Sequence, residues 1–565
     1  MKTLKLIILI SALCGISNQS ISQNLMWAKQ FGGTNYDRGN SITIDATGNV
    51  YTTGFYQGTA DFDPGPGVYN LIGSGAYVSK IDALGNFIWA KQFEGANGLS
   101  IAVDANGNVY TSGSFSDTVD FDPGIGTYNL ICSGFVDVFI SKLDVSGNFI
   151  WARRIGGVSL DLGRSIAVDT NGNVYTTGSF ANQVDFDPGP GTYNLNCFGN
   201  GIFILKLDNS GNLVWAKQMG GNDDDYGYSI ALDSSANIYT TGTFINTADF
   251  DPGVGIYDLI ADSINTENIF ISKLDASGNF IWAKNLGGKY FCPPNTSINA
   301  ITIDVGGNVY TCGFIDNTAD FDPGLGTYNL SGIGAFVSKL DNSGNFLWAK
   351  QIASSSGAIA YAITTDANGN VYTTGYFSDT TDFDPGIGIY NLIEGASNGD
   401  VFISQLNPSG NFISAIQFKG SSGTTATGFS ISVDNYGNIY ATGRFSSIVD
   451  FDPGSGIYSL TSLLEDIFVV KLNNITTQLE NFNSLNIAKI YPNPAASHFK
   501  IEFVNNINQG IVEIYNVMGE KVFEETIHNS AKKEIVLENI YEGIYVVKVF
   551  DGKISYCKKL IVEYD

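Results

Sequence analysis

One five-residue motif, Asp-Phe-Asp-Pro-Gly, occurs seven times in this chain of 565 residues. The copies lie about 60–70 residues apart, and they begin at Asp61, Asp120, Asp185, Asp249, Asp320, Asp382 and Asp450. A unit of this length is too long for one coil of a solenoid, and it has the size of one β-propeller blade with an added excursion. The repeat therefore predicts an all-β fold in which one unit is used seven times.

Each unit contains four short segments with the composition of β-strands. In the second unit these segments are residues 100–104, 109–115, 138–144 and 149–153, and they are rich in Val, Ile, Phe and Tyr. The first and third connections share the sequence Asp-x-x-Gly-Asn, in which the carboxylate bonds to the backbone and Gly accepts a left-handed conformation. Four antiparallel strands joined in this way form one blade.

The seventh unit lacks its fourth segment, because the chain after residue 472 continues as Asn-Asn-Ile-Thr-Thr. A matching segment with Trp-Ala-Lys lies instead ahead of the first unit, at residues 25–31. If this N-terminal strand completes the last blade, the ring closes without open edges. We therefore expect a closed seven-bladed β-propeller over residues 24–472, with Trp27 beside the strand at 466–472.

Two further positions repeat in the blades. The second segment ends in Gly, as at Gly54 and Gly113, which indicates a close backbone approach where different blades converge on the axis. The fourth segment carries Trp in five units, as at Trp89 and Trp151, and a regular aromatic of this kind indicates packing between blades.

Because strand direction alternates, the connections of a blade lie on two faces. The tight Asp-x-x-Gly-Asn turns share one face, which hardly varies between units. The excursions between the second and third strands share the other face with the links between blades, and these carry the variation in length. Binding residues are disproportionately on loops held by a rigid scaffold, so the second face is favoured for binding.

The repeated excursion carries a pair of acids. Pro64 and Gly65 suit the centre of a type II turn, Phe62 is expected to cover the blade, and Asp61 and Asp63 are expected on the other side. Paired carboxylates suit either hydrogen bonds that cap the hairpin or Ca²⁺, although the further acid of an EF-type loop is missing. No other cofactor is expected. The remaining pairs are Asp120 and Asp122, Asp185 and Asp187, Asp249 and Asp251, Asp320 and Asp322, Asp382 and Asp384, and Asp450 and Asp452.

The links between blades mix Tyr, Asp and Arg, which is typical of a surface that recognises glycan or protein. Ordinary solvated loops are the alternative for any single residue. The candidate residues are Tyr36, Asp37, Arg38, Asp161, Arg164, Asp223, Asp224, Asp225, Tyr226, Tyr290 and Phe291.

Charge and histidine content argue against two classes of function, nucleic-acid binding and catalysis. A net charge of −26 is unsuited to a nucleic-acid partner, because phosphate binding needs clustered Lys and Arg. The two histidines, His498 and His528, follow the repeats, so the repeats have no His base and no His metal ligand. The repeated acids would make seven equivalent sites, whereas an enzyme usually needs one asymmetric site. We therefore expect no catalysis.

Residues 1–22 have the features of a signal peptide. Lys2 and Lys5 precede a short apolar run, and Ser20 and Ser22 supply small residues before a cleavage site. No segment of the mature chain is long and apolar enough to predict a transmembrane helix.

A polar linker at 473–486 precedes a different region at 487–565. Its expected strands at 498–504, 510–516, 521–526, 533–537, 543–550 and 554–562 predict a small Ig-like β-sandwich. Its motifs resemble the C-terminal sorting domain of type IX secretion (type A). The residues that carry this resemblance are Tyr491, Pro492, Asn493, Pro494, Gly519, Gly543, Lys558 and Lys559.

The resemblance implies export through the Sec route of a Gram-negative bacterium and recognition by the type IX machinery at the outer membrane. It also implies removal of the domain when the protein is released or anchored. Residues 24–472, with Gly-Asn-Val-Tyr-x-x-Gly and Ser-Lys-Leu-Asp-x-Ser-Gly-Asn, resemble the bacterial seven-bladed β-propeller repeat (SBBP type). That repeat implies no defined activity.

Together these features predict a secreted or surface-displayed propeller that binds an extracellular glycan or protein. One alternative is a structural or adhesive surface component without a discrete ligand. The other is a polysaccharide-active enzyme that uses carboxylates.

Overall fold

The computed structural model describes residues 22–290, 300–354, 357–395, 398–475, 489–516, 521–537, 540–550 and 555–563. Its regular elements are β-strands, and the chain divides into two compact units between Ile475 and Thr476. The expected signal peptide, apart from Ser22, lies outside the described residues, as do most residues of the expected linker. Among the described residues no helix is long and apolar enough to cross a membrane.

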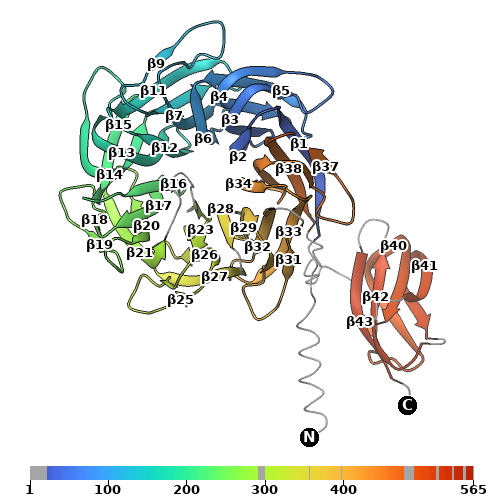
Figure 1. Ribbon diagram of the computed structural model, residues 1–565. Helices are drawn as coiled ribbons and strands as arrows, with labels where there is room; N and C mark the ends of the chain where they lie inside the picture. The colour runs from blue at the N-terminus through green and yellow to red at the C-terminus, as the bar shows by residue number, and fades with distance from the viewer. Residues whose placement is uncertain are drawn as a thin grey trace. The chain divides into compact units, whose positions relative to one another are not determined.

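In the described part of the first unit, the strands pair into seven antiparallel groups of four (Figure 1). The first strands are β2 (Arg38–Ile44), β6 (Ala96–Val103), β12 (Leu162–Val168), β16 (Tyr226–Leu232), β22 (Ala300–Ile303), β28 (Ala358–Thr365) and β34 (Ala426–Val433). The second strands are β3 (Val50–Asp61), β7 (Val109–Phe115), β13 (Val174–Asp185), β17 (Ile238–Ile245), β23 (Val309–Ile315), β29 (Val371–Phe377) and β35 (Ile439–Phe445).

The outer half of each group completes the predicted order of strands. The third strands are β4 (Asn70–Ile81), β10 (Asp137–Leu143), β14 (Asn194–Leu207), β20 (Glu267–Leu274), β26 (Gly334–Leu340), β32 (Asp400–Leu406) and β38 (Asp466–Ile475). The fourth strands are β5 (Phe87–Glu94), β11 (Phe149–Gly157), β15 (Leu213–Gly221), β21 (Phe280–Tyr290), β27 (Phe346–Ser354), β33 (Phe412–Gly420) and, from the N-terminus, β1 (Ser22–Gly33).

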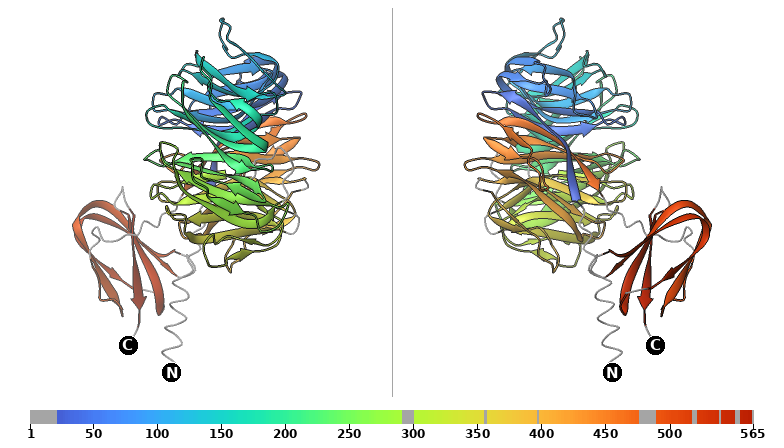
Figure 2. Two further views of the ribbon diagram at one scale, coloured as in Figure 1. Left: turned by 90° about the vertical axis from the view of Figure 1, so that its left-hand side faces the viewer. Right: turned by 90° about the vertical axis from the view of Figure 1, so that its right-hand side faces the viewer.

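The groups are arranged in a ring with the first strands at its centre (Figure 1). Each first strand contacts the first strands of both neighbouring groups, and the cycle closes between β34 and β2. Serine side chains link these strands. The Oγ of Ser41 accepts the backbone N–H of Ile101 at 3.3 Å, and the Oγ of Ser430 accepts that of Ile42 at 3.2 Å. From the side, connections protrude on both faces of the ring (Figure 2).

The N-terminal strand closes the seventh group. β1 pairs antiparallel with β38 from Ser22 opposite Ile475 to Phe31 opposite Ile467, and Trp27 lies opposite Lys471. This confirms the expectation that Trp27 lies beside the strand at 466–472.

Five of the seven groups are joined to the next group by a Lys and a Trp that share one acceptor, and in the third group only Lys206 makes this bond. The Nε1 of Trp89 and the Nζ of Lys80 donate to the carbonyl of Val145, at 3.2 and 3.3 Å, in the last tight turn of the next group. The ammonium also lies 4.9 Å from the ring centroid of Tyr51, a cation–π distance. This geometry confirms that the fourth-strand Trp packs between groups.

The sixth group lacks this link for a topological reason. Its acceptor would be a turn between the third and fourth strands of the seventh group, but those two strands come from opposite ends of the chain. Gln405 and Ser414 replace the Lys and Trp, and the Nε2 of Gln23 donates to the Oγ of Ser414 at 3.3 Å. The irregularity in the repeat therefore follows from ring closure.

The glycines that end the second strands do permit a close backbone approach. The prediction that this approach joins different groups was wrong, because the neighbouring backbone belongs to the same group. A Cβ at Gly113 would lie 2.0 Å from the carbonyl oxygen of Asn97, which belongs to the same group. The approach to a neighbouring group occurs in the first strand, where a Cβ at Gly98 would lie 2.3 Å from the Oγ1 of Thr53.

The excursions form short hairpins against the preceding group. In the first and third groups they continue the long strands β3–β4 and β13–β14. Elsewhere they are separate strands: β8 (Thr118–Asp120) and β9 (Asn129–Ile131), β18 (Thr247–Asp249) and β19 (Asp258–Ile260), β24 (Ala319–Asp320) and β25 (Asn329–Leu330), β30 (Thr380–Asp382) and β31 (Asn391–Ile393), and β36 (Ile448–Asp450) and β37 (Ser459–Thr461). Asp61 pairs with Gly32 of β1, so the excursion lies beside the link between groups, on the predicted face.

Phe62 is fully buried and its ring lies 5.6 Å from that of Phe31 and 4.7 Å from that of Tyr77, as expected for a residue that covers the group. The predicted type II turn is wrong, because Gly65 does not have the positive φ that this turn requires. The glycines are needed for a different reason. The Asp63 carboxylate folds over the turn, and a Cβ at Gly67 would lie 2.2 Å from its Oδ2.

The second unit has fewer and longer strands than expected. It contains β39 (Ile490–Tyr491), β40 (His498–Asn516), β41 (Lys521–Val536), β42 (Gly543–Phe550) and β43 (Ser555–Val562). β40 and β41 each merge two strands that the sequence separates, because β40 continues through a register irregularity between Glu502 and Ile507. The sheet order is β39-β40-β42-β43, with β41 paired to β40.

The sorting-motif residues join the two ends of this unit. The Oδ1 of Asn493 accepts the N–H of Ile561 at 2.8 Å, and Ala495 forms a parallel bridge with Val562. Tyr491 ends β39, and the ammonium of Lys532 lies 5.1 Å from its ring centroid. Pro492 and Pro494 flank Asn493, Gly543 begins β42, and Lys558 and Lys559 belong to β43, whereas Gly519 lies outside the described residues.

Candidate functional site: a cavity at the centre of the ring

A bulge in the first strand turns one residue of each described copy out of the sheet. The register between first and second strands shifts immediately after Gly39, and it shifts at the same place in five other groups. A β-bulge leaves one residue unpaired and re-aims its side chain. The residues at the bulges are Asn40, Leu99, Arg164, Tyr228, Tyr361 and Phe429.

Five of these six bulge residues line one cavity of about 440 Å³. The strands that meet there come from five groups, so the cavity lies where first strands converge at the centre of the ring. Its remaining lining residues are Arg38, Tyr376, Asn398, Thr425, Ala426, Thr427 and Arg444. They stand at the starts of first strands, at the ends of second strands or in nearby links, which places the cavity on the variable face.

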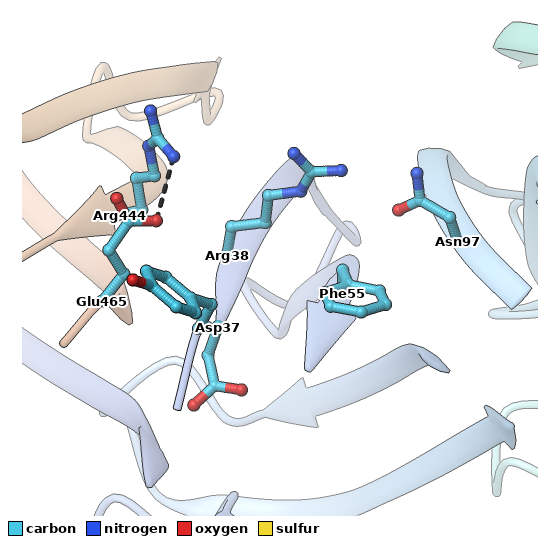
Figure 3. A pocket seen from close by; sticks show the side chains of 7 residues that line it. Asp37, Arg38, Phe55, Asn97, Arg444 and Glu465 are labelled. Carbon is cyan, nitrogen blue, oxygen red and sulfur yellow. Dashed lines mark hydrogen bonds and ion pairs between the residues drawn. The ribbon is translucent and has the colours of Figure 1, made fainter. Parts of the chain in front are cut away.

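A second cavity of about 330 Å³ adjoins the first and shares Arg38 and Arg444 with it. We call the two together the axial cavity. The second part extends to Tyr36, Asp37, Phe55, Asn97 and Glu465. Figure 3 shows the guanidinium groups of Arg38 and Arg444 on one side of this part, with the carboxyl group of Asp37 turned the opposite way.

Three arginines of the axial cavity each lie near an aromatic ring. The guanidinium carbons lie 6.0 Å from the ring centroid for Arg38 and Phe55, 5.1 Å for Arg164 and Tyr228, and 5.7 Å for Arg444 and Phe429. These are cation–π distances. The Nη1 of Arg444 also donates to a carboxylate oxygen of Glu465 at 2.9 Å (Figure 3). The rings thus orient the guanidinium groups.

The cavity concentrates positive charge on an acidic protein. The chain has a net charge of −26 and five arginines, of which three line this cavity. Burial is the main cause that lowers the pKa of Arg38, and the positive charge of Arg444 lowers it further, whereas Glu465 acts in the opposite direction. The guanidinium group of Arg444 is therefore close enough to disfavour the charged form of Arg38.

Three of the acids predicted for recognition are buried and accept hydrogen bonds from backbone N–H groups. Asp37, Asp161 and Asp225 occupy the same position before their first strands, and each is at most 1% exposed. The carboxylate of Asp37 accepts the N–H of Gly33 and that of Gln57, both at 2.9 Å, which ties the link to the end of the second strand. Burial raises the pKa of these acids, to about 7 for Asp37, about 6 for Asp161 and about 7 for Asp225.

The other predicted loop residues are spread around the ring. The Oδ2 of Asp223 accepts a hydrogen bond from Asn246 at 2.9 Å. Asp224 accepts the backbone and side-chain N–H groups of Asn200, at 3.0 and 2.8 Å, and the hydroxyl of Tyr226 accepts from the same side chain at 3.3 Å. Tyr290 ends β21, and Phe291 lies outside the described residues. Of the candidates, Tyr36, Asp37, Arg38 and Arg164 border the axial cavity.

Of the seventeen residues that line the axial cavity, thirteen were not predicted from the sequence, including Arg444, Tyr361, Tyr376 and Phe429. The sequence does contain a pattern that marks the cavity positions, and it lies inside the repeated strands. The residue after the strand-end Gly varies between units while its neighbours repeat, and the residue after the first-strand Gly varies in the same way. In chain order the first set is Phe55, Ser114, Ser179, Thr243, Phe314, Tyr376 and Arg444.

The repeated acids of the excursions form local hydrogen bonds. The Oδ1 of Asp61 accepts the N–H of Asp63 at 3.0 Å and that of Tyr69 at 2.8 Å, and the Oδ1 of Asp63 accepts the N–H of Gly65 at 2.8 Å. The other six copies repeat these bonds. Within the described ranges, no three or more His, Cys, Asp or Glu side chains are grouped to hold a metal ion.

Two families match parts of the chain. Residues 489–563 match the secretion system C-terminal sorting domain, and residues 27–54, 150–179, 214–243 and 347–384 match the β-propeller repeat. The chain therefore carries β-propeller repeats and a C-terminal sorting domain of type IX secretion, and secretion follows from the sorting domain.

Among curated proteins, an uncharacterized WD repeat-containing protein of Acanthamoeba polyphaga mimivirus is 25% identical over 512 residues, covering 75% of this chain. The regulatory protein FlaEY of Caulobacter vibrioides is 29% identical over 102 residues, covering 18% of this chain. The matched regions span 36% and 11% of the lengths of these two relatives.

Three solved structures are similar at low sequence identity. A protein of unknown function from Bacteroides caccae is 9% identical with a TM-score of 0.30, over 60% of this chain and 97% of its own. The C-terminal WD40 domain of Sif2 is 10% identical with a TM-score of 0.37, over 79% and 98%. A GH43 protein, BlXynB of Bacillus licheniformis, is 10% identical with a TM-score of 0.24, over 81% and 97%.

Proposed function

We propose that this chain, which carries β-propeller repeats and a type IX sorting domain, is an exported binding module that recognises an extracellular glycan or protein in its axial cavity. The proposal includes a seven-bladed propeller, an Ig-like sorting domain and a signal peptide at 1–22 that is removed during export from a Gram-negative cell. The type IX machinery is the partner of residues 487–565.

The observation that carries this proposal is the convergence of the bulge residues. Six units place side chains of five different types at one structural position, and five of these six residues line a single cavity. A scaffold position that repeats in geometry and varies in chemistry is suited to recognition, because the rigid strands fix where each side chain points.

The proposed role is binding without catalysis. The described lining supplies guanidinium groups, amides, hydroxyls and rings, which fix a ligand by hydrogen bonds and stacking. Glycoside hydrolysis needs two carboxyl groups on either side of the scissile bond. The axial cavity has two carboxyl groups, but that of Asp37 accepts the backbone N–H groups of Gly33 and Gln57, and that of Glu465 accepts a hydrogen bond from Arg444. Asp223, Asp224 and Asp225, the one singular acidic run, accept hydrogen bonds that hold a link between groups.

For the acids of the excursions we propose hairpin capping rather than calcium binding. Both N–H groups that reach Asp61 come from its own hairpin, which supports a role in fixing the turn. Calorimetric titration of the chelated protein with Ca²⁺ tests this choice. Capping predicts no heat of binding at millimolar Ca²⁺, and saturable heat would show that the acids serve as ligands.

The binding role is tested with the exported chain on an array of bacterial and plant glycans and surface proteins. Leu99→Trp fills the axial cavity, and Leu84→Trp adds the same volume to a tight turn, where Leu84 is 73% exposed. We expect Leu99→Trp to abolish any array signal and Leu84→Trp to leave it unchanged. A signal that survives Leu99→Trp would place binding outside the cavity.

A further inference from the structure

Arg38 and Arg444 form a like-charged pair that the protein itself satisfies only in part. The Nε atoms of both residues are buried and have no hydrogen-bond partner among the described residues. Glu465 accepts one bond from Arg444, and the carboxyl of Asp37 points away from the cavity (Figure 3). A third guanidinium group, that of Arg164, lines the same cavity. An anion in this space would remove the mutual repulsion.

We propose that the axial cavity binds a short saccharide through an anionic substituent held between Arg38 and Arg444. The inference rests on the proposed binding role of the cavity and names the class of its ligand. A carboxylate of a uronic acid and a sulfate ester share the required chemistry, since both accept paired N–H donors from guanidinium groups.

The rest of the lining favours a saccharide. The rings of Tyr361, Tyr376 and Phe429 supply apolar faces for the C–H groups of a sugar. Thr427 supplies a hydroxyl for the sugar hydroxyls, and Asn40, whose Nδ2 donates to the carbonyl of Gly98 at 2.7 Å, supplies its amide oxygen as an acceptor. Tyr361 and Phe429 lie edge to face with centroids 5.5 Å apart, so they form one corner of the cavity. Volumes of about 330 and 440 Å³ lie at the lower end of small-ligand sites and suit one or two sugar rings.

Charge limits the length of the ligand. A long polyanion would extend over a protein of net charge −26 and would be repelled by it. A short oligosaccharide with one or two anionic groups gains the local attraction of the arginines without that penalty. We therefore expect oligosaccharides to bind at least as well as the parent polymer.

The test is isothermal titration of the full exported chain with three trisaccharides: a galacturonate trisaccharide, a trisaccharide with one sulfate ester and a neutral galactose trisaccharide. We expect at least one anionic trisaccharide to bind at least about tenfold more tightly than the neutral one, because only an anionic substituent forms hydrogen bonds to the guanidinium groups in which both partners are charged. Whichever of the two anionic trisaccharides binds more tightly shows whether the cavity prefers a carboxylate or a sulfate ester. Affinity should fall as salt is raised.

The matched variants are Arg444→Gln and Arg153→Gln. Both remove one positive charge, but Arg153 lies outside the axial cavity, where it donates to the carbonyls of Gly211 and Ser210. Arg444→Gln should weaken anionic binding at least about tenfold, whereas Arg153→Gln should leave it unchanged. Arg444→Lys keeps the charge and should restore part of the loss. Thermal unfolding of each variant shows whether it folds.

Three results would overturn the inference, and they differ in what they say of the binding role. Equal affinity for neutral and anionic trisaccharides, lost in Leu99→Trp, would refute the anionic ligand but keep the cavity as a saccharide site. Binding of an acidic peptide in place of every saccharide would keep the cavity and refute the saccharide. Equal losses in Arg444→Gln and Arg153→Gln would refute the anionic pocket, because they would reflect overall charge.

Discussion

Aspartate occupies two opposite electrostatic settings in this protein. In the tight turns burial acts to raise the pKa of Asp45, but hydrogen bonds from Thr47 and Asn49 outweigh it, so the pKa is lowered. At the starts of first and third strands burial dominates, and it raises the pKa of Asp37 to about 7 and that of Asp466 to about 6. Asp466 also raises the pKa of Asp37 by its charge.

These raised values predict how stability depends on pH. A carboxyl group with a folded-state pKa above its unfolded value near 3.8 stabilises the fold fully below about pH 4, and this contribution is lost as pH rises through about 7. Asp466→Asn removes the charge beside Asp37. We expect the variant to be more stable than wild type at pH 8, by about 1 kcal/mol, and nearly equal to it at pH 5.

The measurement is the thermal midpoint of unfolding at both pH values. Asp400→Asn is the control, because Asp400 holds the same repeat position but the next group begins with Ala426 instead of an acid. The Asp400→Asn variant should show no increase in the thermal midpoint at pH 8. A gain of equal size in both variants would contradict the role of the Asp37–Asp466 pair.

A second residue-scale prediction concerns Ala236, which replaces Gly in one tight turn and has a φ of 57°. Left-handed backbone costs an L-residue about 1–2 kcal/mol, so Ala236→Gly should stabilise the protein by about 1 kcal/mol. Ala105, in the equivalent turn of the second group, does not have a positive φ. Ala105→Gly should therefore destabilise, by about 0.5–1 kcal/mol. Denaturant unfolding of both variants checks the sign of each change.

At the scale of elements, the links between groups decide how well the ring holds together. The Nε1 of Trp89 donates to the next group, whereas the Nε1 of Trp215 has no hydrogen-bond partner among the described residues. Both rings pack edge-on against a Tyr of their own group, with centroids 6.3 Å apart. The two sites therefore differ mainly in one hydrogen bond.

Trp89→Phe should destabilise more than Trp215→Phe, with a difference of about 1 kcal/mol, because only the first change removes a hydrogen bond to the neighbouring group. Midpoints of denaturant unfolding measured under one condition give this difference. If Trp215→Phe cost as much as Trp89→Phe, ring packing and not the shared carbonyl would join the groups.

Most strand positions, and the pairing that closes the ring, could be predicted from the sequence. The strands of the second group lie where the pattern places them, and the partner of Trp27 was identified because the repeat is complete enough to show which strand is missing. The cavity did not follow, since its position depends on bulges that turn Asn40 and Phe429 out of otherwise regular strands. The merged strand β40 also could not be foreseen, because its continuity arises from pairing with β41 and β42.

At the scale of the whole molecule, the two chain ends of the ring meet in the seventh group. Removal of residues 22–33 leaves β38 paired with β35 alone and opens an edge. We expect this truncated chain to lose cooperative thermal unfolding. A rearranged chain in which the same residues follow residue 475 keeps the pairing, because Ser22 and Ile475 lie opposite each other. It should unfold near the wild-type midpoint, and failure to do so would argue against the closure.

The sorting domain predicts a separate outcome in cells. Deletion of residues 489–563, the matched region, should leave the chain in the periplasm while the axial cavity is unchanged. Cell fractionation and surface labelling provide the measurement. Unimpaired secretion of the deleted chain would show that export does not depend on this domain.

The most direct test of the central claim, that the axial cavity is the ligand site, is a crystal structure of the exported chain with the galacturonate trisaccharide. We predict that the trisaccharide lies in the axial cavity, with a carboxylate between the guanidinium groups of Arg38 and Arg444 and a sugar ring against Tyr361 or Phe429. A saccharide bound on the face of the tight turns, with the arginines arranged as in Figure 3 around an empty cavity, would contradict it.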